Sequence, residues 1–192
     1  KRGGNEQEVT VMFADIRGFT PATEQKPPKE IVTILNEYFE IMVDIVFQRG
    51  GTLDKFMGDG MMAIWGAPFE QPEHAQSAVI AAIEMQEALK ELNETRVSEG
   101  LEPFKVGIGL NTGDMVAGYM GSSRSMSYTV VSDAVNVASR ICDLAGPGEV
   151  IITGETLSHL KGQLETELLP PAKLKGKSNT LDLYKVLGFS KT

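Results

Sequence analysis

A glycine–aspartate–glycine turn between two strand-forming runs constrains this chain more than any other stretch. The runs Leu53–Met57 and Met61–Trp65 are rich in apolar residues, and Gly58, Asp59 and Gly60 separate them. An Asp-Gly tip between apolar runs is typical of a β-hairpin. The pattern therefore predicts a hairpin that carries the Asp59 carboxylate at its tip.

A second aspartate follows the first strand-forming run of the chain. Apolar side chains alternate along Val9–Ala14, and Asp15 comes directly after them. Taken singly, either aspartate is explained better by helix capping or turn chemistry. Two carboxylates without a nearby histidine, however, form an all-oxygen site that suits Mg²⁺ or Mn²⁺. The working hypothesis is that Asp15 and Asp59 hold metal ions for phosphoryl chemistry.

Hydrophobic periodicity gives the order of the remaining elements. Amphipathic helices are predicted over 30–49, 74–99 and 133–144, with a short helix ending at 161. Further strands are predicted at 104–110, 115–119, 127–131, 150–152, 164–169 and 181–187, with a hairpin turn at 111–114. The order predicts an α+β fold with a ferredoxin-like βαββαβ core, a C-terminal αβ extension, and helices packed on one face of an antiparallel sheet. In that topology the first and third strands are neighbours, so Asp15 and Asp59 would meet.

Composition limits the classes of partner. A net charge of −8 gives no electrostatic reason to expect nucleic acid or an anionic membrane. No run approaches the roughly 18 apolar residues of a membrane span, so we expect no membrane contact by this segment and a cytoplasmic location for it. The single cysteine, Cys142, fits a reducing compartment and a buried apolar role.

The chain reads as one domain with a short tail. Residues 1–7 are polar and are predicted to form a linker, and residues 8–192 a single domain. Because the sequence begins at Lys1 rather than at a methionine, we expect a longer protein with an upstream regulatory domain. Its attachment to a membrane cannot be read from this segment. His74 has no other histidine or cysteine close in sequence, so a helix-end or solvent role is expected rather than a metal-ligand role.

Five segments in order resemble one family over about residues 8–187. They are FADIRGFT (13–20), GTLDKFMGDGMMAIWGAP (51–68), GIGLNTGDMVAGYMG (107–121), SYTVVSDAVNVASR (127–140) and LKGK (174–177). Together they resemble the class III nucleotidyl cyclase catalytic domain. The one departure noted is Ser132, where the family usually has glycine; a serine there can cap the following helix.

The resemblance implies roles for the aspartates and the loop that follows the first strand. Asp15 and Asp59 would bind two divalent metal ions, Mg²⁺ or Mn²⁺, together with the backbone carbonyl of Ile16. The backbone amides of Phe19 and Thr20 would hold phosphate oxygens at the start of a helix.

It also implies roles for polar residues that periodicity alone would assign to solvated surfaces. Asn136 would orient the ribose, and Arg140 would stabilise charge on the α-phosphate. Lys175 would bind the terminal phosphates, and Arg124 is a weaker candidate for phosphate contact.

Base recognition is assigned by the resemblance to Lys55 and Thr129. A lysine ammonium only donates, so it can reach adenine N1 but not the N1–H of guanine. Thr129 can accept from the adenine 6-amino group. Guanylyl cyclases of the family typically present a glutamate at the lysine position, so this pair points to ATP.

The resemblance thus implies an adenylyl cyclase that forms 3′,5′-cyclic AMP and pyrophosphate. One chain would supply Asp15 and Asp59, and its partner in a homodimer would supply Lys55, Thr129, Asn136, Arg140 and Lys175, giving two equivalent sites. The alternatives are a guanylyl cyclase and a catalytically silent nucleotide-binding or dimerisation module. A diguanylate cyclase is disfavoured because no GGDEF-like segment is present.

Overall fold

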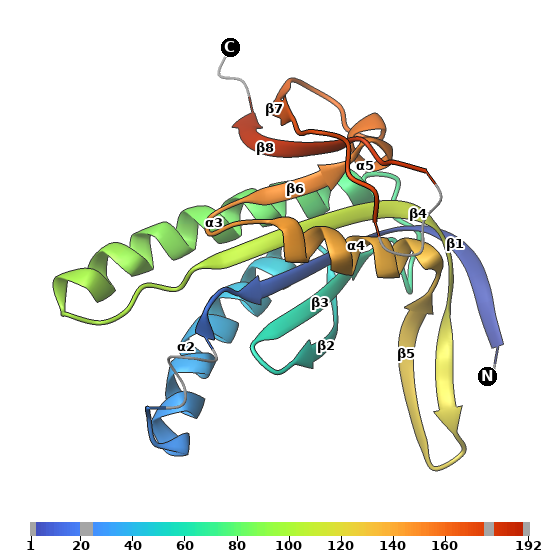
Figure 1. The fold of residues 1–192 in the computed structure, drawn as a ribbon. Helices are drawn as coiled ribbons and strands as arrows, with labels where there is room; N and C mark the ends of the chain where they lie inside the picture. Colours follow the sequence, from blue (N-terminus) through green and yellow to red (C-terminus); the bar gives the residue numbers. More distant parts are fainter. Residues whose placement is uncertain (1–2, 20–24, 175–178, 190–192) are drawn as a thin grey trace.

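The fold is taken from a computed structural model that describes residues 3–19, 25–174 and 179–189 (Figure 1). Thr20 and Lys175 lie outside the described residues, so the roles predicted for them stay predictions. The strands are β1 (Gly3–Ile16), β2 (Thr52–Met57), β3 (Gly60–Trp65), β4 (Val106–Ser122), β5 (Ser125–Val131), β6 (Val150–Thr153), β7 (Leu164–Leu168) and β8 (Leu183–Phe189). The helices are α2 (Pro28–Gln48), α3 (His74–Ser98), α4 (Asp133–Leu144) and α5 (Gly154–Ser158).

The described strands form one sheet in the order β2-β3-β1-β4-β6-β8-β7, and β5 pairs with the outer half of β4. This confirms the α+β fold and the central pairing of the first and third strands. The sheet is not purely antiparallel, however, because β4 and β6 run parallel. A parallel pair follows from the connection through α4, since such a connection must cross over a face of the sheet.

The turn predicted at 111–114 is wrong, because β4 runs through it without interruption. β1 pairs with β4 along its whole length, from Gly3 opposite Tyr119 to Ile16 opposite Val106. Asn111 and Thr112 are buried, and both side chains are hydrogen-bonded. This long-range pairing outweighs the local turn preference of an Asn-Thr-Gly-Asp sequence.

Helices cover both faces of the sheet, so the prediction that they lie on one face is wrong. On one face, α2 and α3 pack over the even-numbered residues of β1, and the core there includes Met12, Ala14 and the fully buried Trp65. On the other face, α4 packs over the odd-numbered residues of β1, and the core there includes Phe13 of β1 and Cys142 of α4. Side chains on successive strand residues point to opposite faces, so β1 contributes side chains to both cores. Burial raises the pKa of the Cys142 thiol to about 12, which suits the apolar role predicted for it.

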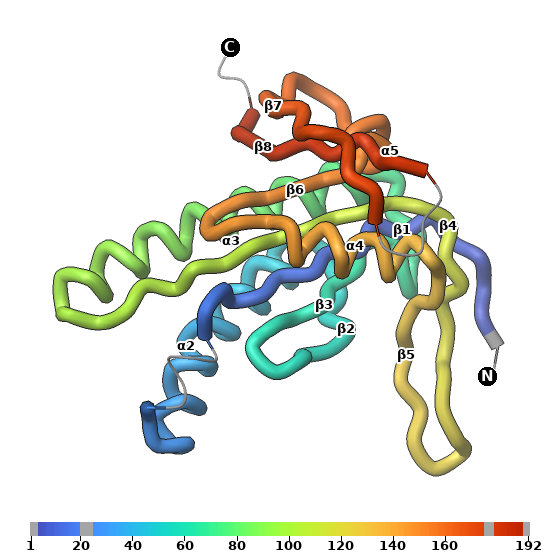
Figure 2. The backbone as a smooth tube through the Cα atoms, viewed as in Figure 1, coloured from blue at the N-terminus to red at the C-terminus, as the bar shows by residue number. Residues whose placement is uncertain are grey.

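The β4–β5 hairpin, with the first residues of β1 paired alongside β4, extends beyond the helices as an arm (Figure 2). We call residues 114–131 the arm; it carries exposed apolar side chains, namely Val116, Tyr119, Met126 and Val131. No helix in the described part of the chain is long and apolar enough to cross a membrane.

Candidate active site

Asp15 and Asp59 lie beside each other at one end of the β1–β3 pair. Asp15 is opposite Gly60 in the antiparallel register, so the tip of the β2–β3 hairpin meets the end of β1. The two aspartates line one cavity of about 140 Å³ with Ser139 and Asp143 of α4. The strand order predicted from the sequence required this meeting. That the two carboxylates bind metal stays a prediction.

The electrostatics of this pair favour a bound cation. Burial, a hydrogen bond to the Asp15 carboxyl and the charge of Asp15 raise the pKa of Asp59 to about 6, in that order of effect. Two neighbouring carboxylates in a partly buried position repel each other and resist ionisation. A divalent cation between them would remove that repulsion, and the all-oxygen donor set is the kind that Mg²⁺ and Mn²⁺ prefer. The residues present therefore fit the metal that the family implies.

Arg17 fixes the position of Asp15, and sequence reasoning missed it. Its guanidinium lies 3.4 Å from the Asp15 carboxylate and donates to the backbone carbonyls of Ala145 (2.9 Å) and Cys142. Gly107 leaves room for it, since a Cβ there would lie 2.7 Å from the Arg17 side chain. An arginine two residues after a strand-end aspartate has no motif of its own, so no local signal could have revealed this contact.

The base-recognition candidates Lys55 and Thr129 meet at a third residue, Asp54. The Thr129 hydroxyl donates to the Asp54 carboxylate at 2.7 Å, and the Lys55 ammonium lies 3.6 Å from the other oxygen. The Asp54 side chain is only 1% exposed, whereas that of Lys55 is 52% exposed. Asp54 is therefore a buried carboxylate that joins β2 to β5, and sequence reasoning did not single it out.

A β-bulge in β2 places Asp54 and Lys55 on the same side of the sheet. The register against β3 shifts between Leu53 and Lys55, which leaves Asp54 as the extra residue. Leu53 packs against the α2–α3 core, and the ring of Phe56 lies 4.4 Å from that of Phe39 on α2. Strict alternation would put residues 53 and 56 on opposite faces; the bulge puts both toward α2. Both intervening side chains can then face β5.

The other predicted residues lie apart from the aspartate pair. Asn136 is exposed and Arg140 is half-buried on α4, and neither lines the cavity beside Asp15 and Asp59. Lys55 and Thr129 do not line it either. Arg124 is exposed in the turn between β4 and β5.

The residues at the end of β1 are placed by the sheet and the first core. Ile16 is the last residue of β1, and Phe19 packs partly against the α2–α3 core. At the start of α4, Ser132 accepts a hydrogen bond from the amide of Ala134, which confirms the predicted cap. His74 begins α3 as predicted, but it is buried, so the solvent role considered for it is wrong.

Comparisons with known proteins agree with this architecture. The sequence profile of the adenylate and guanylate cyclase catalytic domain matches residues 3–188. Adenylate cyclase 1 of Rhizobium meliloti is 36% identical over 97% of this chain, and an adenylate cyclase of Anabaena cylindrica is 34% identical over 94%. The chain spans 28% and 37% of the lengths of these two relatives.

Solved structures of a guanylyl cyclase and of an adenylyl cyclase are both similar to this chain. The guanylyl cyclase Cya2 superposes with a TM-score of 0.93 at 36% identity, covering 99% of this chain and 96% of its own. The adenylyl cyclase CyaB from P. aeruginosa superposes with a TM-score of 0.92 at 32% identity, covering 98% and 97%. The resemblance found in the sequence is thereby confirmed: this chain belongs to the adenylate and guanylate cyclase catalytic domain family.

Proposed function

We propose that this domain converts ATP to 3′,5′-cyclic AMP and pyrophosphate at sites shared between two copies of the chain. The observation that supports ATP over GTP is the direction of the hydrogen bond from Thr129 to Asp54. A buried carboxylate only accepts, so the Thr129 proton is committed to it and the hydroxyl offers lone pairs alone to a ligand. Lys55, in contrast, offers donors alone.

This pair matches adenine and mismatches guanine. Adenine presents an acceptor at N1 and a donor at its 6-amino group, which meet the Lys55 ammonium and the Thr129 oxygen. Guanine reverses both polarities, with a donor at N1 and an acceptor at O6. Each mismatch costs about 1–3 kcal/mol once the bound base covers the group, so the two mismatches together should give a preference above tenfold.

Asp15 and Asp59 are the proposed metal ligands, with the Ile16 carbonyl beside them. When bound there, divalent cations would acidify the ribose 3′-hydroxyl and offset charge on the triphosphate. The chain itself holds the two carboxylates in place through the β1–β3 register and the Arg17 contact. The amides of Phe19 and Thr20 are the proposed phosphate contacts.

A second copy of the chain is needed to complete the site. A cavity of about 140 Å³ is too small for a nucleoside triphosphate, since ligand pockets occupy roughly 300–1,000 Å³. The proposed base, ribose and phosphate contacts (Lys55, Thr129, Asn136, Arg140, Lys175 and Arg124) would come from the partner. Exposed apolar side chains on the arm, and Phe56 and Met57 on β2, offer a surface for this homodimer.

Catalysis would then depend mostly on positioning and on neutralising charge. The ribose 3′-oxygen attacks the α-phosphorus in line, and pyrophosphate leaves. Asn136 is proposed to orient the ribose, and Arg140 to donate to the α-phosphate as its charge grows.

Product identification tests the proposal directly. The chain is incubated with ATP and with GTP, in Mg²⁺ and in Mn²⁺, over a range of protein concentrations. We expect cyclic AMP as the main product and a specific activity that rises with protein concentration as dimers form. Cyclic GTP product in excess would reassign the chain as a guanylyl cyclase, and no product from either nucleotide at any concentration would favour the silent module.

Mixing two inactive variants tests the shared site. Asp59→Ala removes a proposed metal ligand. Arg140→Ala removes a phosphate contact that the other chain of the dimer is proposed to supply. Each homodimer should be inactive, while the mixed dimer keeps one complete site and should recover part of the activity. If mixing restores nothing although heterodimers form, the two-chain site is wrong.

A further inference from the structure

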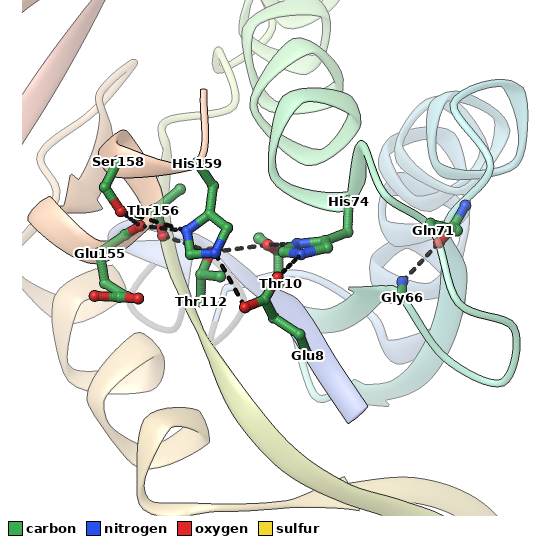
Figure 3. A network of polar contacts seen from close by, with 10 residues as sticks. All are labelled: Glu8, Thr10, Gly66, Gln71, His74, Thr112, Glu155, Thr156, Ser158 and His159. Atoms are coloured by element: carbon green, nitrogen blue, oxygen red, sulfur yellow. Dashed lines mark hydrogen bonds and ion pairs between the residues drawn. The ribbon is translucent and has the colours of Figure 1, made fainter. Parts of the chain in front are cut away.

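The only two histidines of the chain come together at one carboxylate, away from the aspartate pair. The Nε2 atom of His74 lies 2.8 Å from one oxygen of Glu8, and the Nε2 atom of His159 lies 3.1 Å from the other. The ring centroids are 5.4 Å apart. Figure 3 shows Glu8, from β1, meeting both rings, with His74 at the start of α3 and His159 just after α5.

A row of buried hydroxyl groups connects His74 to the Asn111 side chain, and its hydrogen bonds can run in either of two directions. Thr153 donates to the side-chain oxygen of Asn111 at 2.7 Å, so its proton is committed. In one direction, Thr156 donates across the 3.2 Å contact to Thr153, and Thr112 donates across the 2.9 Å contact to Thr156.

The row ends at the Nδ1 atom of His74. Because Thr112 has committed its proton, Thr10 donates the 2.8 Å hydrogen bond between them. Thr10 then has only lone pairs for the 2.7 Å contact with His74, so Nδ1 is the donor there. A neutral imidazole has one N–H, so in this direction the His74 Nε2 lone pair faces Glu8, whereas the opposite direction places the N–H on Nε2.

His159 is oriented in the same way. Its Nδ1 atom lies 2.9 Å from the backbone carbonyl of Glu155, which can only accept, so Nδ1 is again the donor. In the neutral ring the Nε2 lone pair also faces the Glu8 carboxylate. In this arrangement two imidazole lone pairs and a carboxylate converge, and a cation between them would satisfy all three groups.

We propose that His74, His159 and Glu8 form a binding site for one zinc-class divalent transition-metal ion, with water in the remaining coordination position. The three ligand atoms lie within 4.8 Å of one another, and zinc bonds of about 2.0–2.1 Å need them roughly 3.3 Å apart. Small side-chain rotations supply the difference. Metal-binding histidines characteristically donate their other N–H to a fixed acceptor, and Thr10 and the Glu155 carbonyl are such acceptors here.

A proton on each ring is the alternative cation, and at His74 burial disfavours it. The His74 side chain is 4% exposed, and placing a charged ring there costs free energy of desolvation. Two protonated rings would also share the single Glu8 carboxylate.

The site is separate from the aspartate pair in position and in metal preference. Glu8 precedes Asp15 by seven residues on β1, about 23 Å at roughly 3.3 Å per residue. Glu8 faces α3, whereas Asp15 faces α4, because even and odd residues of the strand point to opposite sides. Imidazole nitrogen suits zinc, copper or nickel, while Mg²⁺ prefers the oxygen ligands of the aspartates.

Calorimetric titration of the whole chain with Zn²⁺ in excess Mg²⁺ tests the proposal, because Mg²⁺ occupies the aspartate pair. We expect one Zn²⁺ per chain and a rise in Tm on binding. Glu8→Gln and His159→Ala should each weaken Zn²⁺ binding at least about 100-fold, since changes even behind a ligand cost 10–100-fold. Both side chains are partly exposed, and melting in EDTA checks that the variants fold.

Glu73→Gln is the matched control. Glu73 lies next to His74 in sequence but pairs with Lys161 at 2.9 Å, so its loss should leave Zn²⁺ affinity unchanged. Co²⁺ provides a second readout, since histidine ligation gives a visible absorption band that should be lost in His159→Ala. The site is refuted if the wild-type chain binds no Zn²⁺ in excess Mg²⁺, or if binding survives unchanged in both ligand variants.

Discussion

Asp54 and Asp59 stand five residues apart on one β-hairpin, yet they occupy opposite electrostatic environments. Asp54 is almost completely buried, but it accepts a hydrogen bond from Thr129 and has the Lys55 ammonium nearby. Asp59 is less buried, but its nearest charged neighbour is another carboxylate, and its pKa is raised to about 6. Burial alone therefore does not decide which aspartate is poised to bind a cation.

Asp54 is a carboxylate that holds neighbouring groups in place, whereas Asp59 is placed to bind a ligand. A buried charge is stable where donors and an opposite charge satisfy it, as at Asp54. A carboxylate beside a like charge is costly in the free protein, and proteins keep such pairs mainly at functional sites. We expect substitution of Asp59 to abolish activity and spare the fold, and substitution of Asp54 to affect stability and base choice.

Asp59→Asn should produce the largest effect. Loss of one metal ligand should lower kcat for cyclic nucleotide formation at least about 1,000-fold, because bound metal contributes several kcal/mol to the transition state. Stability in metal-free buffer should not fall, since the repulsion between residues 15 and 59 disappears. Turnover assays with thermal melting in EDTA measure both. Asp44→Asn, which removes an exposed carboxylate that accepts a hydrogen bond from Gln48 in its own helix, is the control.

Arg17→Ala tests whether the aspartate pair needs a fixed partner. Without the guanidinium, Asp15 loses its 3.4 Å ion pair and the link to the end of α4. Supporting residues of this kind typically contribute 10–100-fold to metal affinity or activity, so the Mg²⁺ concentration for half-maximal activity should rise by about that factor. Arg17→Lys should rescue little, because a single ammonium cannot make the same set of contacts. An unchanged Mg²⁺ dependence would show that the hairpin register alone positions Asp15.

The sequence could predict part of this site but not all of it. Asp15 and Asp59 were predictable because each ends a clear strand pattern, and the strand order then brings them together. Asp54 was not, because its orientation depends on a β-bulge that leaves no local signal. The continuous β4 and the burial of His74 were missed for a similar reason: pairing with β1 decides both, and partners distant in sequence outweigh local turn and surface preferences.

Asp54→Ala should change base selection more than turnover. The Thr129 hydroxyl would regain a free proton and could donate to guanine O6, and Lys55 would lose its nearby carboxylate. The ratio of kcat/KM for ATP over GTP should fall about tenfold, the equivalent of one hydrogen-bond mismatch. Unfolding free energy should fall by about 1–3 kcal/mol, as the donor is left unsatisfied.

Asp54→Asn separates the specific role from a structural one. Its side-chain oxygen can still accept from Thr129, so most of the ATP preference should return even if some stability does not. If both variants lose stability while the ATP/GTP ratio stays constant, Asp54 is structural only, and the hydrogen-bond argument for ATP fails.

An exposed ion pair supplies the smallest effect and a reference for the two buried carboxylates. Arg49 contacts Glu84 through two hydrogen bonds, one of 2.8 Å, and lowers the pKa of Glu84 below 4.5. A lowered folded-state pKa means that the stabilisation is present above the ordinary pKa and is lost as pH falls through the folded value. Because solvent screens the pair, Glu84→Gln should cost at most about 0.5 kcal/mol of unfolding free energy at neutral pH. The difference from wild type should disappear well below pH 4.5, as denaturant unfolding across pH would measure. A larger cost at neutral pH would mean that solvent exposure weakens the contribution of a carboxylate's ion pair to stability less than we assume.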